Sequence, residues 1–362
     1  MTIRYELCPE CQCKQPVADS NNLGFGAART NHIFVADYKN GEWQDARIVP
    51  YADFSIAPGA LCFHYGQTLF EGGKAFRHGN GDVYAFRFDK NAERLNDSAV
   101  ILQMPPIPVE LQVEGFLRLM DLDRTFCPHE DECSIYIRPF MFATEDALSI
   151  RPSVNYRYCI MLSPSGPYYP GGFSKPIKLL ISTSFHRAVS GGTGNAKAGG
   201  NYAASMRAGD YARSQGAAQV LYLDASNTYI EEAGIMNHFH VLKDGTFIIP
   251  EFTNSILKSI TSRSVLELAA AGKIKARQER ILFKDFLEGL RSGEIIEAGG
   301  FGTAAVISPA GTYILEDGTE ITVGDGAIGK HTRALYEMYT GMQTGKHPAP
   351  EGWLMKIPHY AK

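Results

Sequence analysis

The chain has 362 residues, of which 44% are hydrophobic and 20% charged, and this length and composition are typical of a globular protein with two domains. Its formal net charge of −4 argues against binding to nucleic acid or to an anionic membrane, because both favour an excess of basic residues. No apolar run reaches the length that is needed to span a bilayer.

The N-terminal segment contains cysteines but not the apolar stretch of a secretory signal. Seven scattered cysteines in such a chain predict a cytoplasmic protein with reduced thiols. The sequence "CPECQC" brings Cys8, Cys11 and Cys13 together as in half of a zinc site, but zinc needs four ligands and no second pair follows. We therefore expect no metal site, and we expect residues 1–20 to form a mobile tail.

The first half of the chain mixes strands and helices. Residues 81–104 are predicted to form a strand that leads into a helix, because apolar residues recur near helical spacing at Ala92, Leu95 and Ala99. A second helix is expected within residues 108–126. Aromatic and β-branched residues predict strands over residues 133–144 and 155–166.

A segment rich in proline, glycine and serine, "SPSGPYYPGGFSKP", follows these strands and is typical of an interdomain linker. We place a smaller N-terminal domain at residues 1–165, a linker at 166–175 and a larger C-terminal domain at 176–362. Short strands in the second domain alternate with turn signals, and helices are predicted at residues 201–214, 261–271, 284–291 and 330–344. Without regular βαβ alternation, the pattern favours an α+β fold over a doubly wound sheet.

The segment "SGGTGNAKAGGNYAASM" surrounds a single lysine, Lys197, with glycines. It could be a flexible surface loop, a phosphate-binding loop, or a site where a buried amine does covalent chemistry. A P-loop is disfavoured, because its lysine follows a glycine and precedes Ser or Thr, whereas Lys197 lies between Ala196 and Ala198. Glycines allow a ligand to approach the backbone closely, which favours the covalent interpretation over the flexible loop.

The same segment closely resembles the active-site region of the branched-chain amino-acid aminotransferases, which are class IV pyridoxal-phosphate (PLP) enzymes. The resemblance extends over about residues 23–345. It rests on segments in family order: "FGAARTNHIF", "FHYGQTLFEGGKAFR", "AFRFDKNAERLNDSA", "SIYIRPFMF", "PSGPYYPGG", "IEEAGIMNHFHV", "SILKSITSRSVLELA" and "GGFGTAA". It implies the two-domain class IV fold, with a smaller N-terminal α/β domain and mostly antiparallel strands in the larger C-terminal domain.

For the cofactor ring, the resemblance implies that Lys197 carries PLP as an internal aldimine and later moves a proton between Cα of the amino acid and C4′ of the cofactor, which serves as electron sink. Glu232 matches the carboxylate beside the pyridine nitrogen. Its neighbour Glu231 should face the other side of the strand. Tyr202 matches the hydroxyl that binds the ring oxygen.

For the cofactor phosphate, the resemblance implies backbone N–H groups of Ile260 and Thr261 at a helix start. The hydroxyl of Thr303 adds a further donor. Arg94 matches the cationic partner of the phosphate, and Arg187 is a further candidate to approach it.

The family's substrate pocket is aromatic and apolar, as a branched aliphatic side chain requires. Arg138, shielded by Tyr65 and Tyr136, is expected to accept the second carboxylate of glutamate or 2-oxoglutarate. The residues that match the pocket are Phe25, Tyr65, Phe70, Tyr136, Arg138, Tyr168, Ala304 and Ala305.

Two positions depart from relatives. Ile235 stands where many relatives have Thr, which removes a possible hydroxyl contact to cofactor or substrate. Ala305 and Ser308 stand where mammalian members carry a Cys-x-x-Cys redox pair, so a thiol switch is excluded there.

The function implied is reversible transamination between the branched-chain L-amino acids Leu, Ile and Val and 2-oxoglutarate, giving branched-chain 2-oxo acids and L-glutamate. Relatives are homodimers, so a homodimer or higher homo-oligomer is expected, with Tyr65, Leu148 and Ile150 contributed to the neighbouring subunit. Alternatives are a D-amino acid aminotransferase, an aminodeoxychorismate lyase, or a non-catalytic binding protein on this fold. The last is disfavoured by the presence of Lys197.

Overall fold

The computed structural model describes residues 1–9, 12–16, 23–130, 132–168 and 172–360. Contacts between residues divide the chain into two units. The first comprises residues 1–168, 196–200 and 341–362, and the second comprises residues 169–195 and 201–340. Each unit is described by itself below.

A nine-stranded, mostly antiparallel sheet forms the framework of the first unit. Its order is β1 (Arg4–Tyr5), β3 (Glu42–Pro50), β2 (His32–Lys39), β8 (Tyr156–Ser165), β7 (Ser134–Ala143), β5 (Gly73–Arg77), β6 (Val83–Phe86) and β18 (Leu354–Lys356), with β4 (Thr68–Phe70) also paired to β7. The last strand shows why residues 341–362 belong to this unit, because β18 pairs with β6 at the end of the sheet.

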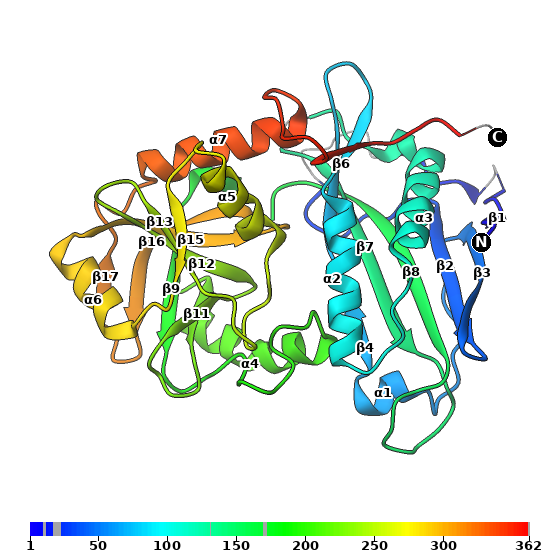
Figure 1. Ribbon diagram of the computed structural model, residues 1–362, viewed down its shortest axis with the longest axis horizontal. Coiled ribbons are helices and arrows are strands. Elements are labelled where there is room, and N and C mark those ends of the chain that lie inside the picture. The colour runs from blue at the N-terminus through cyan, green and yellow to red at the C-terminus, as the bar shows by residue number, and fades with distance from the viewer. Residues whose placement is uncertain (10–11, 17–22, 131, 169–171, 361–362) are drawn as a thin grey trace. The chain divides into compact units, whose positions relative to one another are not determined.

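Two helices, α2 (Phe88–Ile101) and α3 (Val109–Leu122), pack on this sheet (Figure 1), and α1 (Leu61–Tyr65) precedes β4. Their apolar stripes meet the sheet in one core that includes Phe88 and Phe116. Gly115 allows α3 to approach β2 closely, because a Cβ atom there would lie 2.7 Å from the ring of Phe34. The helix that the sequence predicts within residues 108–126 ends at Leu122 and is followed by a short 3₁₀ turn at Arg124–Phe126.

The second unit also contains a nine-stranded sheet, in the order β11 (Ile230–Ala233), β10 (Gln219–Leu223), β9 (Ile177–Ser182), β16 (Val306–Leu315), β15 (Ile295–Gly302), β12 (Met236–Leu242), β13 (Phe247–Pro250) and β14 (Ala276–Glu279), with β17 (Glu320–Thr322) paired to β16. Because β11 also pairs with β12, the strands from β11 through β12 close into a ring. The helices are α4 (Gly199–Ser214), which begins in the first unit, α5 (Ile260–Ala270), α6 (Phe283–Ser292) and α7 (Lys330–Thr344), which ends in the first unit.

The predicted α+β fold is confirmed, with mostly antiparallel pairing in the second unit. The helices predicted at residues 261–271 and 284–291 are α5 and α6 to within one residue at each end, and α7 has the predicted bounds. Residues 294–315, in the part of the second domain where short strands are predicted, contain two strands. They form the hairpin of β15 and β16, whose turn at residues 303–305 contains no proline or asparagine to announce it.

The contact-defined units differ from the predicted domain boundaries in two segments, residues 196–200 and 341–362, because both contact the first unit through backbone pairing. The predicted linker at residues 166–175 includes residues 169–171, which lie outside the described residues. Of the predicted tail, residues 10, 11 and 17–20 lie outside them as well, including Cys11, and its mobility stays a prediction. Described residues nearby do make contacts: β1 pairs in parallel with β3, and the backbone N–H of Cys8 donates to His32 Nε2 at 3.0 Å.

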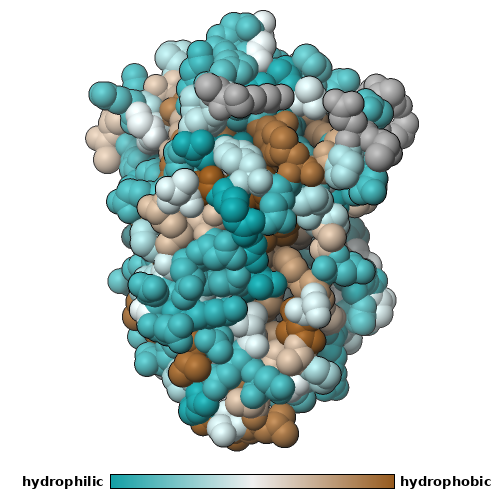
Figure 2. All heavy atoms as spheres, turned by 90° about the vertical axis from the view of Figure 1, so that its right-hand side faces the viewer, coloured by the Kyte–Doolittle hydropathy of each residue, from teal (hydrophilic) through white to brown (hydrophobic). Residues whose placement is uncertain are grey.

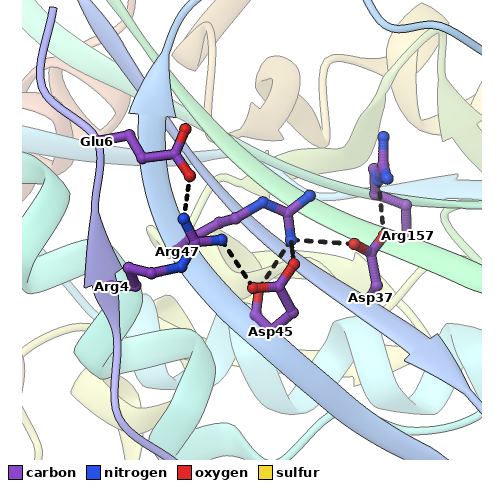
Figure 3. A network of polar contacts seen from close by, with 6 residues as sticks. All are labelled: Arg4, Glu6, Asp37, Asp45, Arg47 and Arg157. Carbon is purple, nitrogen blue, oxygen red and sulfur yellow. Dashed lines mark hydrogen bonds and ion pairs between the residues drawn. The ribbon is translucent and has the colours of Figure 1, made fainter.

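A network of charged side chains connects β1, β3, β2 and β8 at one side of the first unit (Figure 3). Asp37 lies at its centre and accepts hydrogen bonds from Arg157 Nε at 2.7 Å and Arg47 Nη1 at 3.0 Å. Burial raises the pKa of Asp37, but its hydrogen bonds and charge interactions with Arg157 and Arg47 outweigh burial and bring the pKa below its usual range. The other members are Arg4, Glu6 and Asp45.

Figure 2 shows that hydrophilic residues predominate on this side of the first unit, with hydrophobic residues in separate patches between them. Such a face is typical of a surface in contact with water. Within the described part of the chain, no helix combines the length and the apolar character that crossing a membrane requires.

Candidate active site

Lys197 is positioned by the backbone of the first unit. Its carbonyl accepts a hydrogen bond from Phe70 N at 3.0 Å, and its own N–H donates to Ser98 Oγ of α2 at 2.9 Å. The next residue, Ala198, forms an isolated bridge with Leu69 of β4. The amine of this half-buried side chain lies 4.8 Å from the centroid of the Phe70 ring. Within the glycine-rich segment, residues 197 and 198 are thus held against β4 and α2 by hydrogen bonds of their backbone.

A buried ion pair lies next to this attachment. Arg94 of α2 donates from Nε to Glu71 Oε1 at 2.7 Å and from Nη2 to Glu71 Oε2 at 2.8 Å. Asn91 Nδ2 donates to the same Oε2 at 2.8 Å, and Glu71 is fully buried. Burial raises the pKa of Glu71, but the charge and hydrogen bonds of Arg94, together with the charge of Lys197, outweigh it and lower the pKa below its usual range.

Five of the predicted pocket residues form one cluster of contacts, which consists of Phe25, Phe70, Tyr136, Arg138 and Tyr168. Phe25 contacts Tyr136 and Tyr168 edge-on, with ring centroids 4.9 Å apart in both pairs. The guanidinium of Arg138 lies 4.7 Å from the Phe70 centroid, and its Nη2 donates to the hydroxyl of Tyr136 at 3.2 Å. Its Nε is buried and has no hydrogen-bond partner among the described residues. The cluster therefore places the guanidinium of Arg138 among aromatic rings, and its Nε–H group makes no hydrogen bond to a described residue.

The glycine after Glu71 is required by this cluster. A Cβ atom at Gly72 would lie 2.1 Å from the hydroxyl oxygen of Tyr136, so only glycine allows the tyrosine to occupy its place beside Arg138. Tyr65 is not part of the cluster. Its side chain is 43% exposed and its hydroxyl donates to the carbonyl of Leu148 in a short hydrogen bond, so the predicted shielding of Arg138 by Tyr65 stays a prediction.

In the second unit, Glu232 of β11 is a buried carboxylate with several partners. Its Oε1 accepts from Leu257 N at 2.9 Å and from Asn237 Nδ2 at 3.0 Å, and its Oε2 pairs with Arg187 Nε at 2.8 Å. Asn237 is held in turn by Ser262 Oγ, which donates to its Oδ1 at 2.8 Å. A cation and two N–H donors stabilise a buried carboxylate in its charged form.

Arg187 has described contacts with Glu232 and with backbone carbonyls. Its Nη2 donates to the carbonyl of Gly194 at 2.8 Å and to that of Ser255 in a short hydrogen bond. The predicted approach of Arg187 to a phosphate stays a prediction. The other acid of the pair, Glu231, is 5% exposed, and burial raises its pKa although Ser255 Oγ donates to it.

The predicted phosphate ligands occupy two backbone features of the second unit. Ile260 and Thr261 are the first residues of α5, whose N-cap Ser259 accepts from Ser262 N at 3.2 Å. The N–H groups of a first helical turn have no partners within the helix. Thr303 lies in the β15–β16 turn with Ala304 and Ala305.

Tyr202, the predicted partner of the ring oxygen, is half-buried in the first turn of α4.

The turn at residues 303–305 ends in a strained backbone. Val306 has φ of 57°, a left-handed conformation that is rare for a β-branched residue and often marks a functional site. Ile235, which departs from many relatives, lies in the Gly234–Ile235 turn between β11 and β12 and is 37% exposed.

Comparison with known proteins identifies the family. The sequence pattern of the family described as "Amino-transferase class IV" matches residues 68–292. The chain belongs to the class IV aminotransferases. It is 43% identical over 344 residues, 94% of this chain and 95% of the other, to the probable branched-chain-amino-acid aminotransferase of Staphylococcus epidermidis.

Two solved structures are similar as well. The branched-chain amino acid aminotransferase of Escherichia coli has a TM-score of 0.75 and 27% identity, covering 91% of this chain and 99% of that one. A second branched-chain amino acid aminotransferase, whose source is abbreviated T.th., is complexed with N-(5′-phosphopyridoxyl)-L-glutamate; it has a TM-score of 0.70 and 26% identity, covering 89% and 98%. The resemblance described above is thereby confirmed for the family and its fold.

For this aminotransferase, the sequence reasoning missed the partners that hold the predicted residues. Glu71 was part of a recognised segment but had no role, although an acid inside an apolar strand run is a signal of a buried ion pair. Ser262 and Asn237, which support Glu232, carried no such signal.

Lys74 of β5 pairs in register with Tyr136, and burial lowers its pKa to about 8.

Proposed function

We propose that the protein transfers amino groups reversibly between branched-chain L-amino acids and 2-oxoglutarate, with PLP as cofactor. The observation that carries the proposal is the similarity over nearly the whole chain to proteins named branched-chain-amino-acid aminotransferases. The phosphopyridoxyl–glutamate compound in the second of the two solved structures supports both the cofactor and glutamate as the second substrate.

Each unit by itself offers groups that suit a phosphorylated pyridine aldehyde. Lys197 supplies an amine, Glu232 a buried carboxylate, and Arg94 a cation, while the first turn of α5, at Ile260 and Thr261, supplies N–H donors. An anion binds at such a helix start without further charge. When bound, PLP supplies an electron sink for the bonding pair released at the substrate Cα.

Each residue has its own task in the proposed reaction. Lys197 would hold the cofactor by its amine and, once displaced by the substrate amine, move a proton at the substrate Cα. Glu232 would keep a proton on the pyridine nitrogen, and Arg187 would keep Glu232 in place. Tyr202 would donate to the ring oxygen, and Thr303 to the phosphate.

The aromatic cluster around Arg138 would admit both substrates. A branched aliphatic side chain would lie against the rings of Phe25, Phe70 and Tyr136 without an ionic partner. Glutamate would place its side-chain carboxylate on the guanidinium, whose Nε is unpaired among the described residues. The resemblance assigns Tyr168, Ala304 and Ala305 to substrate binding as well.

We also propose that the enzyme is at least a homodimer in the cytoplasm. Tyr65, Leu148 and Ile150 are 43%, 67% and 87% exposed, and such apolar side chains suit an interface between subunits. Sedimentation of the purified protein would test this, and a monomer at micromolar concentration would contradict it.

The test of the function is a panel of amino donors with 2-oxoglutarate as acceptor, in the presence of PLP. We expect L-leucine, L-isoleucine and L-valine to yield L-glutamate, and we expect D-alanine and aspartate to be poor donors. Preferential use of a D-amino acid would indicate the D-amino acid aminotransferase alternative. No transamination of any donor, with PLP bound, would contradict the proposal.

A further inference from the structure

The buried pair of Glu71 and Arg94 has a geometry that restricts the arginine. A guanidinium has three nitrogens, and Glu71 engages Nε and Nη2 through separate carboxylate oxygens at 2.7 and 2.8 Å. This is the bidentate arrangement, which fixes the plane of the guanidinium as well as its position. Nη1 is the nitrogen that Glu71 does not engage.

Glu71 itself is held from three directions. Its backbone N–H donates to the carbonyl of Pro139 in β7 at 2.7 Å. Its Oε2 also accepts from Asn91 Nδ2 at 2.8 Å and from the N–H of Gly72 at 3.0 Å. Because Glu71 is fully buried and Arg94 only 5% exposed, water does not compete for these bonds.

The same carboxylate connects the elements that position Lys197. Arg94 and Asn91 belong to α2, the helix whose Ser98 accepts the hydrogen bond of Lys197 N. Glu71 follows directly on Phe70, whose N–H donates to the carbonyl of Lys197. The pair therefore lies beside Lys197, while the hydrogen bonds that hold the lysine backbone are made by Ser98 and Phe70.

We propose that Glu71 is a positioning residue for the cofactor phosphate: it orients Arg94 so that the Nη1 side of the guanidinium, opposite the carboxylate, serves as the phosphate donor. The inference rests on the proposed function, because it takes Arg94 as the phosphate cation. Glu71 does not touch the cofactor. It acts through Arg94, and its effect is specific to the phosphate and independent of the pyridine ring.

Two opposing consequences of removing the Glu71 charge must be weighed. Without it, the positive charge of Arg94 is no longer offset, and this alone would strengthen phosphate binding. However, a glutamine amide offers one acceptor and turns an NH₂ donor toward a guanidinium N–H, so Arg94 must move away. An unrestrained arginine also regains side-chain entropy that phosphate binding must again remove. We expect the loss of geometry to outweigh the gain in charge.

The test uses the apoprotein and two ligands, PLP and pyridoxal, whose dissociation constants are measured by absorbance titration. Glu71→Gln should raise the Kd for PLP roughly tenfold or more, the effect of losing about one charge-assisted hydrogen bond, while the Kd for pyridoxal changes less than about threefold. In an Arg94→Gln background, the same substitution should cause no further loss of PLP affinity. Glu71→Asp keeps the charge but is too short to engage both nitrogens, so it should also weaken PLP selectively.

Asp37→Asn is the matched control. Asp37 is another buried carboxylate that holds two arginines in the same sheet, but β8 and β7 separate its strand β2 from β5. It should lower thermal stability without changing the ratio of the two dissociation constants.

Equal weakening of PLP and pyridoxal by Glu71→Asp, or tighter PLP binding by Glu71→Gln, would overturn the inference. If Glu71→Gln does not fold, Glu71→Asp alone decides between these outcomes. Failure of the proposed function looks different, because the wild-type apoprotein would then bind neither ligand at Lys197.

Discussion

Replacing Arg138 by glutamine should separate the two substrates that share one pocket. The guanidinium of Arg138 is held mainly by aromatic rings, 4.7 Å from the Phe70 centroid and 5.2 Å from that of Tyr136, and by one hydrogen bond to the Tyr136 hydroxyl at 3.2 Å. Its donors are therefore available to a carboxylate. An apolar substrate side chain would use none of them.

The expected magnitude follows from the cost of leaving a carboxylate without its partner in an apolar slot. A hydrogen bond to a charged group contributes about 1.5–3 kcal/mol, so kcat/KM for glutamate or 2-oxoglutarate should fall roughly ten- to a hundred-fold. The leucine half-reaction should fall by less than about threefold, because it loses only packing against the arginine stem.

Single-turnover measurements of each half-reaction for Arg138→Gln would provide the two factors. Arg157→Gln is the matched control, because Arg157 also lies over an aromatic ring of the first unit, 5.5 Å from the Phe54 centroid, and should affect neither half-reaction. If leucine and glutamate lose the same factor in Arg138→Gln, the arginine only supports the pocket and the reasoning is refuted.

Other predictions concern the two acids of β11 and two buried charges of the first unit. Glu232→Gln should lower turnover far more than Glu231→Gln, because Glu232 alone of the two has an ion pair and two N–H donors among the described residues to keep its charge. Equal effects in steady-state assays would contradict the assignment. Asp37→Asn should lower the free energy of unfolding by about 2–3 kcal/mol at pH 7. Because folding lowers the pKa of Asp37, the difference from wild type should begin to shrink near pH 4 and should be lost as the pH falls through the lower pKa of the folded state. Denaturant titrations at several pH values would show a difference independent of pH if the charge of Asp37 were unimportant. Burial lowers the pKa of Lys74 to about 8, so between pH 8 and 10.5 the unfolded chain binds more protons at this residue than the folded chain. The free energy of unfolding should therefore rise with pH in this range, and Lys74→Met should remove that rise in the same titrations. An unchanged profile in Lys74→Met would refute this prediction.

Local patterns were sufficient to predict much of the fold. The bounds of α7 and the near-correct bounds of α5 and α6 follow from helical spacing of apolar residues. The turn between β15 and β16 has no proline or asparagine at residues 303–305 to predict its position, and Val306 after it adopts a left-handed backbone conformation. Strained conformations of this kind depend on the surrounding structure and leave little trace in local sequence.

Family motifs name candidate residues of the site, but they do not show which other residues hold these candidates through tertiary contacts. Lys197, Arg94 and Glu232 were named from their segments. The ion pair of Arg94 with Glu71 joins α2 to the residue that follows β4, 23 positions earlier in the chain, and no spacing rule predicts it. Strand alternation predicts that Glu231 and Glu232 face opposite sides of β11, but it could not show that both acids are buried.

The identity of the lysine that binds the cofactor tests the central claim most directly. The protein loaded with PLP should be yellow, and borohydride reduction should attach the phosphopyridoxyl group permanently to one peptide. Peptide mapping by mass spectrometry should place it on Lys197, and Lys197→Ala should abolish turnover with little change in thermal stability, because a half-buried side chain on a loop contributes little packing. A reduced adduct on another lysine, such as Lys175 or Lys258, or full turnover by Lys197→Ala, would contradict the account.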